Sequence, residues 1–198
     1  MRHLLPAILA MGSVVVASNV LVQFRLGEFL TWGALTYPFA FLVTDITNRV
    51  NGAAAARRVV LAGFAVGLAC SLIAAGLGTT TVRIAVASGA AFLCAQMVDV
   101  AIFERLRHRG WWQAPFLSSL VGSALDTVMF FGIAFAAFLP VDMNTGWANE
   151  AVPLLGAGPL APVWMSLGLA DWLIKVALAA LALVPFRIAI DKILSRPA

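Results

Sequence analysis

Charged residues, cysteine and histidine are all scarce in this chain. Only 11% of its 198 residues are charged, whereas a soluble domain has about 25%. This shortfall excludes an ordinary soluble domain and a disordered protein, and it excludes a nucleic-acid-binding protein although basic residues outnumber acidic ones by 13 to 9. The two cysteines, Cys70 and Cys94, lie in apolar stretches without CxxC spacing, so neither a disulfide framework nor a structural zinc site is expected. His3 and His108 lie outside the apolar stretches, which leaves no histidine site within them.

Long hydrophobic runs make up most of the chain. Hydrophobic residues account for 62% of it, and the mean hydropathy is +0.97. A transmembrane helix needs roughly 20 apolar residues, so this length holds about six spans and no sizeable soluble domain. The predicted segments are residues 4–24, 30–48, 59–77, 84–103, 115–139 and 160–188. Pro38 lies inside the second segment and is predicted to kink or break it.

The basic residues sort onto one side of the predicted bundle. If six segments alternate across the membrane, ten Lys and Arg residues fall on the side of the N-terminus and two, Arg25 and Arg83, on the other. Because positively charged loops stay in the cytoplasm, both termini are predicted to be cytoplasmic. The sequence thus predicts an all-α, polytopic membrane helix bundle, with residues 1–198 forming one domain of six transmembrane helices. The loop of residues 141–158 carries no Lys or Arg and is predicted to lie outside the cytoplasm.

Polar residues inside the apolar segments are the candidate site. A charge at the bilayer centre costs about 2.5–3.5 kcal/mol even on a lenient scale, so such residues should point inward and find partners. Asp171 and Lys175 are four residues apart and are predicted to pair on one helix face. Asp45 and Arg49 share that spacing, and one interpretation is a structural ion pair near the headgroups, whereas Asp126 has no partner in its own segment. The candidate binding residues are Asn19, Gln23, Asp45, Gln96, Asp99, Asp126, Asp171 and Lys175.

These residues admit two functional interpretations and a structural one. Two aspartates sharing a proton can activate water, as in aspartyl proteases. The GxGD-type motif of intramembrane aspartyl proteases is absent, however, and the nearest string is Gly168-Leu169-Ala170-Asp171. No phosphate-binding glycine loop or metal-ligand set is found either, so neither an enzyme nor a cofactor is predicted. Binding and passage of a small polar ligand is the favoured interpretation, and a buried structural network is the alternative.

Several strings in the chain resemble the queuosine precursor transporter family, which is grouped with the vitamin uptake transporters. They occur in order along nearly the whole chain, and the strings around Asp45 and after Trp111 are the most specific. The strings are Ser18-Asn19-x-Leu21-Val22-Gln23, Thr31-Trp32-Gly33-Ala34, Pro38-Phe39-x-Phe41-Leu42-x-Thr44-Asp45-x-Thr47-x-Arg49, Gln96-x-x-Asp99-Val100-x-x-Phe103-x-Arg105-Leu106-Arg107, Trp111-Trp112-x-Ala114-Pro115, Asp126-Thr127 and Asp171-x-x-x-Lys175-Val176.

The resemblance implies uptake of 7-cyano-7-deazaguanine and 7-aminomethyl-7-deazaguanine across the bacterial inner membrane. An aspartate would accept from the ring N–H and the exocyclic amine, which form a donor fork. Asn19, Gln23, Gln96 or Lys175 would donate to the carbonyl group of the base, and an aromatic side chain would cover its face.

The sequence is compatible with three transport mechanisms. A proton on Asp126 or Asp171 could drive uptake, the chain could be a facilitator, or it could be the substrate-binding subunit of a multi-component importer. The expected partners are the deazapurine and the lipid bilayer, with no nucleic acid. The GxxxG motif of Gly63 and Gly67 fits either packing within one chain or a homodimer.

Overall fold

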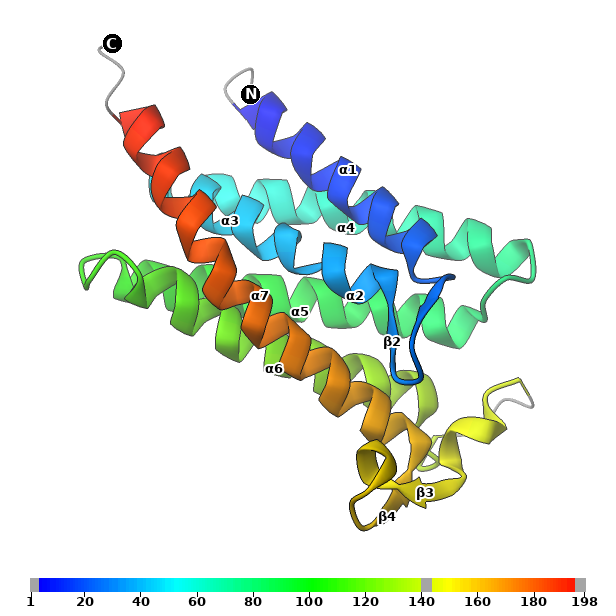
Figure 1. The fold of residues 1–198 in the computed structure, drawn as a ribbon. Helices are drawn as coiled ribbons and strands as arrows, with labels where there is room; N and C mark the ends of the chain where they lie inside the picture. Colours follow the sequence, from blue (N-terminus) through cyan, green and yellow to red (C-terminus); the bar gives the residue numbers. More distant parts are fainter. Residues whose placement is uncertain (1–3, 140–143, 195–198) are drawn as a thin grey trace.

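The computed structural model describes residues 4–139 and 144–194, and its helices follow the predicted segments (Figure 1). They are α1 (Leu5–Leu21), α2 (Trp32–Thr36), α3 (Pro38–Asn51), α4 (Ala53–Gly76), α5 (Val82–Leu106), α6 (Gln113–Phe135) and α7 (Val163–Leu194). Within these ranges, α4, α5, α6 and α7 are long and apolar enough to cross a membrane, and α1 is a shorter apolar helix of 17 residues. The structure therefore confirms a membrane helix bundle. Six complete spans, with α1 and the α2–α3 pair also crossing, stay a prediction.

The second predicted segment is broken at Pro38, as its sequence predicts. Helix α2 ends at Thr36 and α3 begins at Pro38, where the missing N–H of proline is tolerated because first-turn donors have no intrahelical acceptor. Helix α3 then runs through the middle of the bundle and contacts α1, α4, α5, α6 and α7. Its central position buries Thr44, Asp45 and Asn48, so the polar side chains of this segment are covered by the neighbouring helices.

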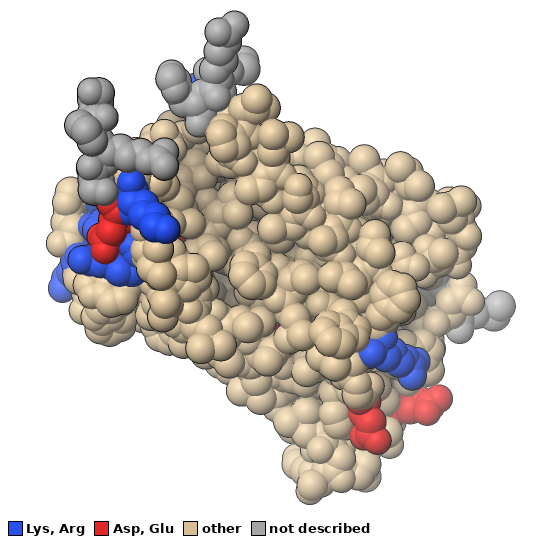
Figure 2. Space-filling model, turned by 45° about the horizontal axis from the view of Figure 1, so that its top comes forward, with Lys and Arg blue, Asp and Glu red and all other residues tan. Residues whose placement is uncertain are grey.

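The exposed charged side chains lie toward the two ends of the bundle. One end holds the start of α1, the α3–α4 turn, the α5–α6 loop and the end of α7, and most of the basic residues belong to these elements (Figure 1). Figure 2 shows charged side chains at opposite ends of this face, with a broad uncharged surface between them. At the α3–α4 turn Gly52 has a φ of 82°, a conformation that glycine adopts without steric penalty. The arrangement matches the predicted sorting of charge, and which end faces the cytoplasm stays a prediction.

Two short β-hairpins lie at the other end. Strand β1 (Arg25–Leu26) pairs with β2 (Leu30–Thr31), and β3 (Ala151–Pro153) pairs with β4 (Leu160–Pro162), both in antiparallel fashion. The single turns η2 (Gly146–Asn149) and η3 (Leu154–Gly156) flank β3. Of the predicted loop 141–158, residues 141–143 lie outside the described residues, and the remainder folds over the ends of α6 and α7.

The GxxxG motif of α4 packs against α1 of the same chain. A Cβ atom at Gly63 would lie 2.5 Å from Met11 Cγ, and one at Gly67 would lie 2.9 Å from Val15 Cγ1. The two glycines therefore let the α1 and α4 backbones approach closely. Packing within the chain accounts for the motif, so the motif gives no evidence for a homodimer.

Candidate functional site

Lys175 of α7 lies between two carboxylates in the bundle interior. Its Nζ atom is 2.7 Å from Asp126 Oδ2 and 2.5 Å from Asp171 Oδ2. The side chains of Lys175, Asp126 and Asp171 are only 6%, 5% and 13% exposed. The predicted pair of Asp171 and Lys175 is present, and Asp126 finds the partner that its own segment lacks on α7. Lys175 thus pairs with Asp171 within α7 and with Asp126 across to α6, so one of its two ion pairs joins the two helices.

Tyr37 and Thr127 complete this cluster. The Tyr37 hydroxyl donates to Asp126 Oδ1 over 3.2 Å, and the Thr127 hydroxyl donates to Asp171 Oδ2 over 2.8 Å. Lys175 Nζ also lies 5.2 Å from the centre of the Tyr37 ring, within the range of a cation–π interaction. We call these five residues, Tyr37, Asp126, Thr127, Asp171 and Lys175, the Lys175 group. Neither Tyr37 nor Thr127 is among the candidate binding residues chosen from the sequence, because their bonds join positions far apart in the chain.

A second buried polar cluster lies where α3, α5 and α6 meet. Asp45 of α3 accepts hydrogen bonds of 3.3 Å from the hydroxyls of Ser118 and Ser119 on α6. The carboxyl group of Asp99 on α5 is adjacent to that of Asp45. Asp99 is fully buried, and neither of its carboxyl oxygens has a hydrogen-bond partner among the residues that the structure describes.

Two buried amide side chains lie three residues from the aspartates on the same helices, Asn48 after Asp45 on α3 and Gln96 before Asp99 on α5. Thr44 donates to Gln96 Oε1 over 2.6 Å, and Asn48 Nδ2 donates to the Val100 carbonyl over 3.1 Å. These bonds leave Gln96 Nε2 and Asn48 Oδ1 buried and, within 4–139 and 144–194, without a partner. We call Asp45, Asn48, Gln96 and Asp99 the carboxylate group.

The ion pair that the spacing of Asp45 and Arg49 suggested is not formed, and that interpretation is wrong. Arg49 Nη1 donates instead to the Arg107 carbonyl, while Arg107 donates to the carbonyls of Asn48 and Arg49. These acceptors lie at helix ends, where carbonyl groups lack intrahelical partners. The Arg49 side chain therefore contacts the end of α5, whereas Asp45, one turn earlier on α3, faces α6.

The structure brings neither Asn19 nor Gln23 into these two groups. Asn19 donates to the Val15 carbonyl and accepts from Ser71, which joins α1 to α4. It borders a small separate cavity that Tyr37 also lines. Gln23 is exposed beyond the end of α1, because the helix ends at Leu21 and the predicted helical stripe stops before it.

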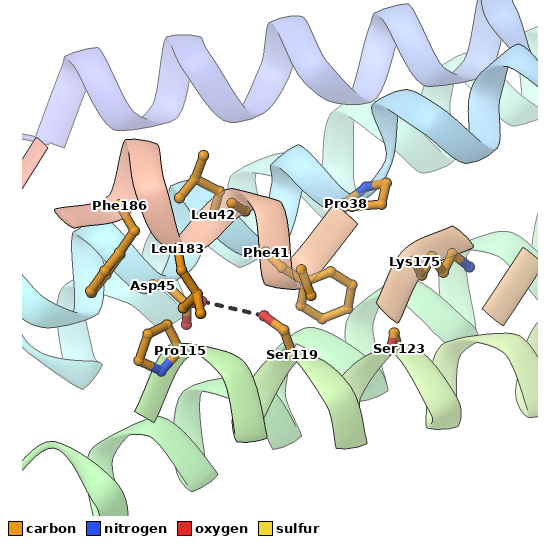
Figure 3. A pocket seen from close by; sticks show the side chains of 12 residues that line it. Pro38, Phe41, Leu42, Asp45, Pro115, Ser119, Ser123, Lys175, Leu183 and Phe186 are labelled. Carbon is orange, nitrogen blue, oxygen red and sulfur yellow. Dashed lines mark hydrogen bonds between the residues drawn. The ribbon is translucent and has the colours of Figure 1, made fainter. Parts of the chain in front are cut away.

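A narrow cleft between α3, α6 and α7 links the Lys175 group and the carboxylate group. Asp45 and Lys175 lie toward opposite ends of it, with Phe41, Ser119 and Ser123 between them (Figure 3). Phe41 fits here because its neighbour on α6 is Gly122, at which a Cβ atom would lie 2.8 Å from Phe41 Cε1. The cleft thus has ionic groups near both ends and an aromatic wall in the middle.

A bundle of apolar helices with charged side chains buried around an internal cleft defines a membrane protein with a polar interior. The family model described as "Putative vitamin uptake transporter" matches residues 31–190, and the chain belongs to this family. The chain is thus a multi-pass transporter of the bacterial inner membrane and not an enzyme.

Three curated relatives are similar over most of the chain. The "Queuosine precursor transporter" of Escherichia coli (strain K12) is 35% identical over 191 residues, which cover 87% of this chain and 79% of the relative. The "Probable queuosine precursor transporter" of Haemophilus influenzae is 34% identical over 171 residues, covering 78% of this chain and 66% of the relative. The protein of the same description from Bacillus subtilis (strain 168) is 25% identical over 191 residues, covering 85% and 74%. These matches confirm the resemblance found in the sequence. No solved structure matches the chain.

Proposed function

We propose that the chain imports 7-deazaguanine precursors of queuosine, namely 7-cyano-7-deazaguanine and 7-aminomethyl-7-deazaguanine. The names of the relatives support queuosine precursors as the class of substrate, and the 35% identity extends over 87% of the chain. The binding residues are proposed from the buried contacts of the Lys175 group.

The observation that carries the proposal is that a buried ammonium lies between two carboxylates at the edge of the cleft. A deazaguanine base presents a carbonyl acceptor beside a ring N–H and an exocyclic amine. Lys175 can donate to the carbonyl group, and Asp126 or Asp171 can accept the two neighbouring N–H bonds as a fork. Lys175 together with one of its two carboxylates would thus offer a donor beside two acceptor oxygens, which is the arrangement that this edge of the base requires.

The carboxylates of the Lys175 group already have donors within the chain. Asp126 accepts from Tyr37 and Lys175, and Asp171 accepts from Thr127 and Lys175. The base would replace the hydroxyl donors with its own N–H groups, so binding exchanges hydrogen bonds and leaves no buried carboxylate unpaired. The Phe41 ring in the cleft and the Tyr37 ring beside Lys175 would cover the face of the base.

The test uses the purified chain alone in liposomes preloaded with unlabelled 7-cyano-7-deazaguanine. Labelled base outside should enter by exchange, which requires no gradient. Transport by the chain alone would also exclude the alternative of a subunit that needs an energising partner. Absence of exchange in a folded, correctly inserted protein would refute the proposed function.

Competition measures how the base is recognised. Guanine should compete with the labelled base, whereas adenine should compete at least about tenfold more weakly, because its ring nitrogen is an acceptor that faces a carboxylate. An unpaired buried acceptor costs about 1–3 kcal/mol, and 1.4 kcal/mol is tenfold in affinity. Equal competition by adenine would contradict recognition by aspartate.

A further inference from the structure

The carboxylate group has no role in the contacts proposed for the base, and its chemistry differs from that of the Lys175 group. We propose that Asp45 and Asp99 bind a monovalent cation, either H⁺ or Na⁺, and that this cation couples uptake to an ion gradient. The proposal rests on the proposed transport function for its coupling role, but the binding of the cation can be tested without it.

Unpartnered oxygen atoms dominate this cluster. Asp99 Oδ1, Asp99 Oδ2 and Asn48 Oδ1 are all buried and lack a donor in the part of the chain that the structure describes. Both residues are fully buried, so the missing donor cannot be bulk water. Gln96 Nε2, which also lacks a partner among the described residues, is a neutral donor and cannot compensate a carboxylate charge. Buried acceptors are almost always satisfied in folded proteins, so an excess of them indicates a ligand with positive charge or a donor hydrogen.

No basic side chain compensates Asp45 or Asp99 within the described ranges. On α3 and α5 the titratable groups that face each other are the two aspartates themselves, and α6 contributes only the hydroxyls of Ser118 and Ser119. Lys175, the cation of α7 that lines the same cleft, is held toward its other end by its own two carboxylates, and Arg187 of α7 pairs with Asp191. Two adjacent carboxylates in an apolar interior repel one another, and a cation between them removes that repulsion.

The donor set indicates the kind of cation. Carboxylate and carbonyl oxygens suit hard cations, whereas transition metals favour imidazole and thiolate ligands. Among the described residues no three His, Cys, Asp or Glu side chains gather into a metal site. Two carboxylates with an amide oxygen and hydroxyls can share a proton or coordinate Na⁺ through the same atoms, and the experiment separates the two.

Helix α3 links the cation site to the base. It carries Asp45 on its second turn, and its first residue follows Tyr37, whose hydroxyl donates to Asp126. Asp45 and Lys175 also line the same cleft (Figure 3). One rigid element therefore contacts both sites, so occupancy of one can change the position of groups at the other.

The experiment measures labelled 7-cyano-7-deazaguanine in proteoliposomes under three conditions. These are an inward Na⁺ gradient at equal pH, an acidic exterior without Na⁺, and no gradient. The wild type should accumulate the base above equilibrium under one of the two gradients, which identifies the ion. Exchange with preloaded unlabelled base is measured in parallel, because it reports the substrate site without a gradient.

Asp45→Asn and Asp99→Asn are compared with Asp191→Asn, which removes an exposed carboxylate at the end of α7. Each of the first two should lower the ratio of gradient-driven uptake to exchange at least tenfold, whereas Asp191→Asn should leave that ratio unchanged. The double variant of Asp45 and Asp99 has no charge at the site, so it should fold without a cation even if a single variant does not. Gradient-driven uptake that survives in Asp99→Asn would overturn the proposal.

Exchange without any gradient-driven uptake in the wild type would also overturn the coupling role while leaving the proposed function intact. If the wild type shows no exchange at all, the proposed function fails, and cation binding is measured on purified protein. The Tm of the wild type should then rise when Na⁺ replaces choline or when the pH falls, and the double variant should lose that response. An equal response in both proteins would exclude Asp45 and Asp99 as the cation site.

Discussion

Lys175→Met should be the most destabilising single substitution in the Lys175 group. The two side chains have similar length, so the change removes the charge and little volume. Asp126 and Asp171 would then be buried without a cation, at 5% and 13% exposure. Breaking a buried ion pair by removing one partner costs about 3–5 kcal/mol. We expect the upper part of this range because two carboxylates lose their cation, although the Tyr37 and Thr127 hydroxyls remain as donors.

Counting charges predicts how further substitutions restore stability. The wild-type group has one lysine and two aspartates, a net charge of −1, and Lys175→Met changes it to −2. Adding Asp171→Asn returns it to −1 but leaves Asp126 without a cation, so recovery should be partial. Adding Asp126→Asn to this double variant gives a triple variant whose group is neutral, and neutral replacements of a buried ionic triad are often as stable as the original. The triple variant should therefore be folded, and it should not transport because it lacks the groups that bind the base.

The assay is thermal aggregation of the purified variants in detergent, together with exchange per folded molecule in liposomes. For a chain of this size, 3–5 kcal/mol corresponds to roughly 6–20 °C in Tm, at about 2–4 °C per kcal/mol. Asp191→Asn is the control, because its pair with Arg187 is 58% and 50% exposed and contributes about 0–1 kcal/mol. A Tm for Lys175→Met within about 2 °C of the wild type would refute the ionic argument. Near-normal exchange by the triple variant would show that the Lys175 group has a structural role and does not bind the base.

Three further predictions concern topology and two close contacts. A tag at either terminus should stay inaccessible from the periplasm while one in the loop 141–158 should be reachable, and a periplasmic C-terminus would contradict the six-span arrangement. Gly122→Ala should lower exchange at least about tenfold, because its Cβ atom would lie 2.8 Å from Phe41 and push the ring into the cleft. The control is Gly132→Ala on the same helix, which should have no effect on exchange because a Cβ atom there meets nothing within 4 Å. Gly63→Ala should lower the stability by about 1–3 kcal/mol, because its Cβ atom would lie 2.5 Å from the Met11 side chain of α1. Thermal aggregation measures this effect against Gly132→Ala, and an unchanged Tm would show that α1 can shift freely.

The sequence predicts those contacts that depend on one helix alone. Asp171 and Lys175 are one turn apart, and residues at that spacing face the same side of any α-helix. Their pair could therefore be predicted before the bundle was known, and it is present. The same rule failed for Asp45 and Arg49, because spacing shows that two side chains can meet and does not show whether another partner is closer. Arg49 had carbonyl acceptors at the end of α5, and Asp45 had two hydroxyls on α6.

By itself the sequence determined the class of protein and its division into apolar segments, because hydropathy and length reflect the solvent of each stretch rather than its neighbours. It also determined the break at Pro38, since the lost N–H acts within the same helix. Only the tertiary structure decided that Asp126 shares Lys175 with Asp171 and that Asp99 lies beside Asp45 without a donor. Those pairings join helices dozens of residues apart, and they depend on how each helix is rotated and packed against the next. Rotation and packing are set by the whole bundle at once, which no local pattern in the chain encodes.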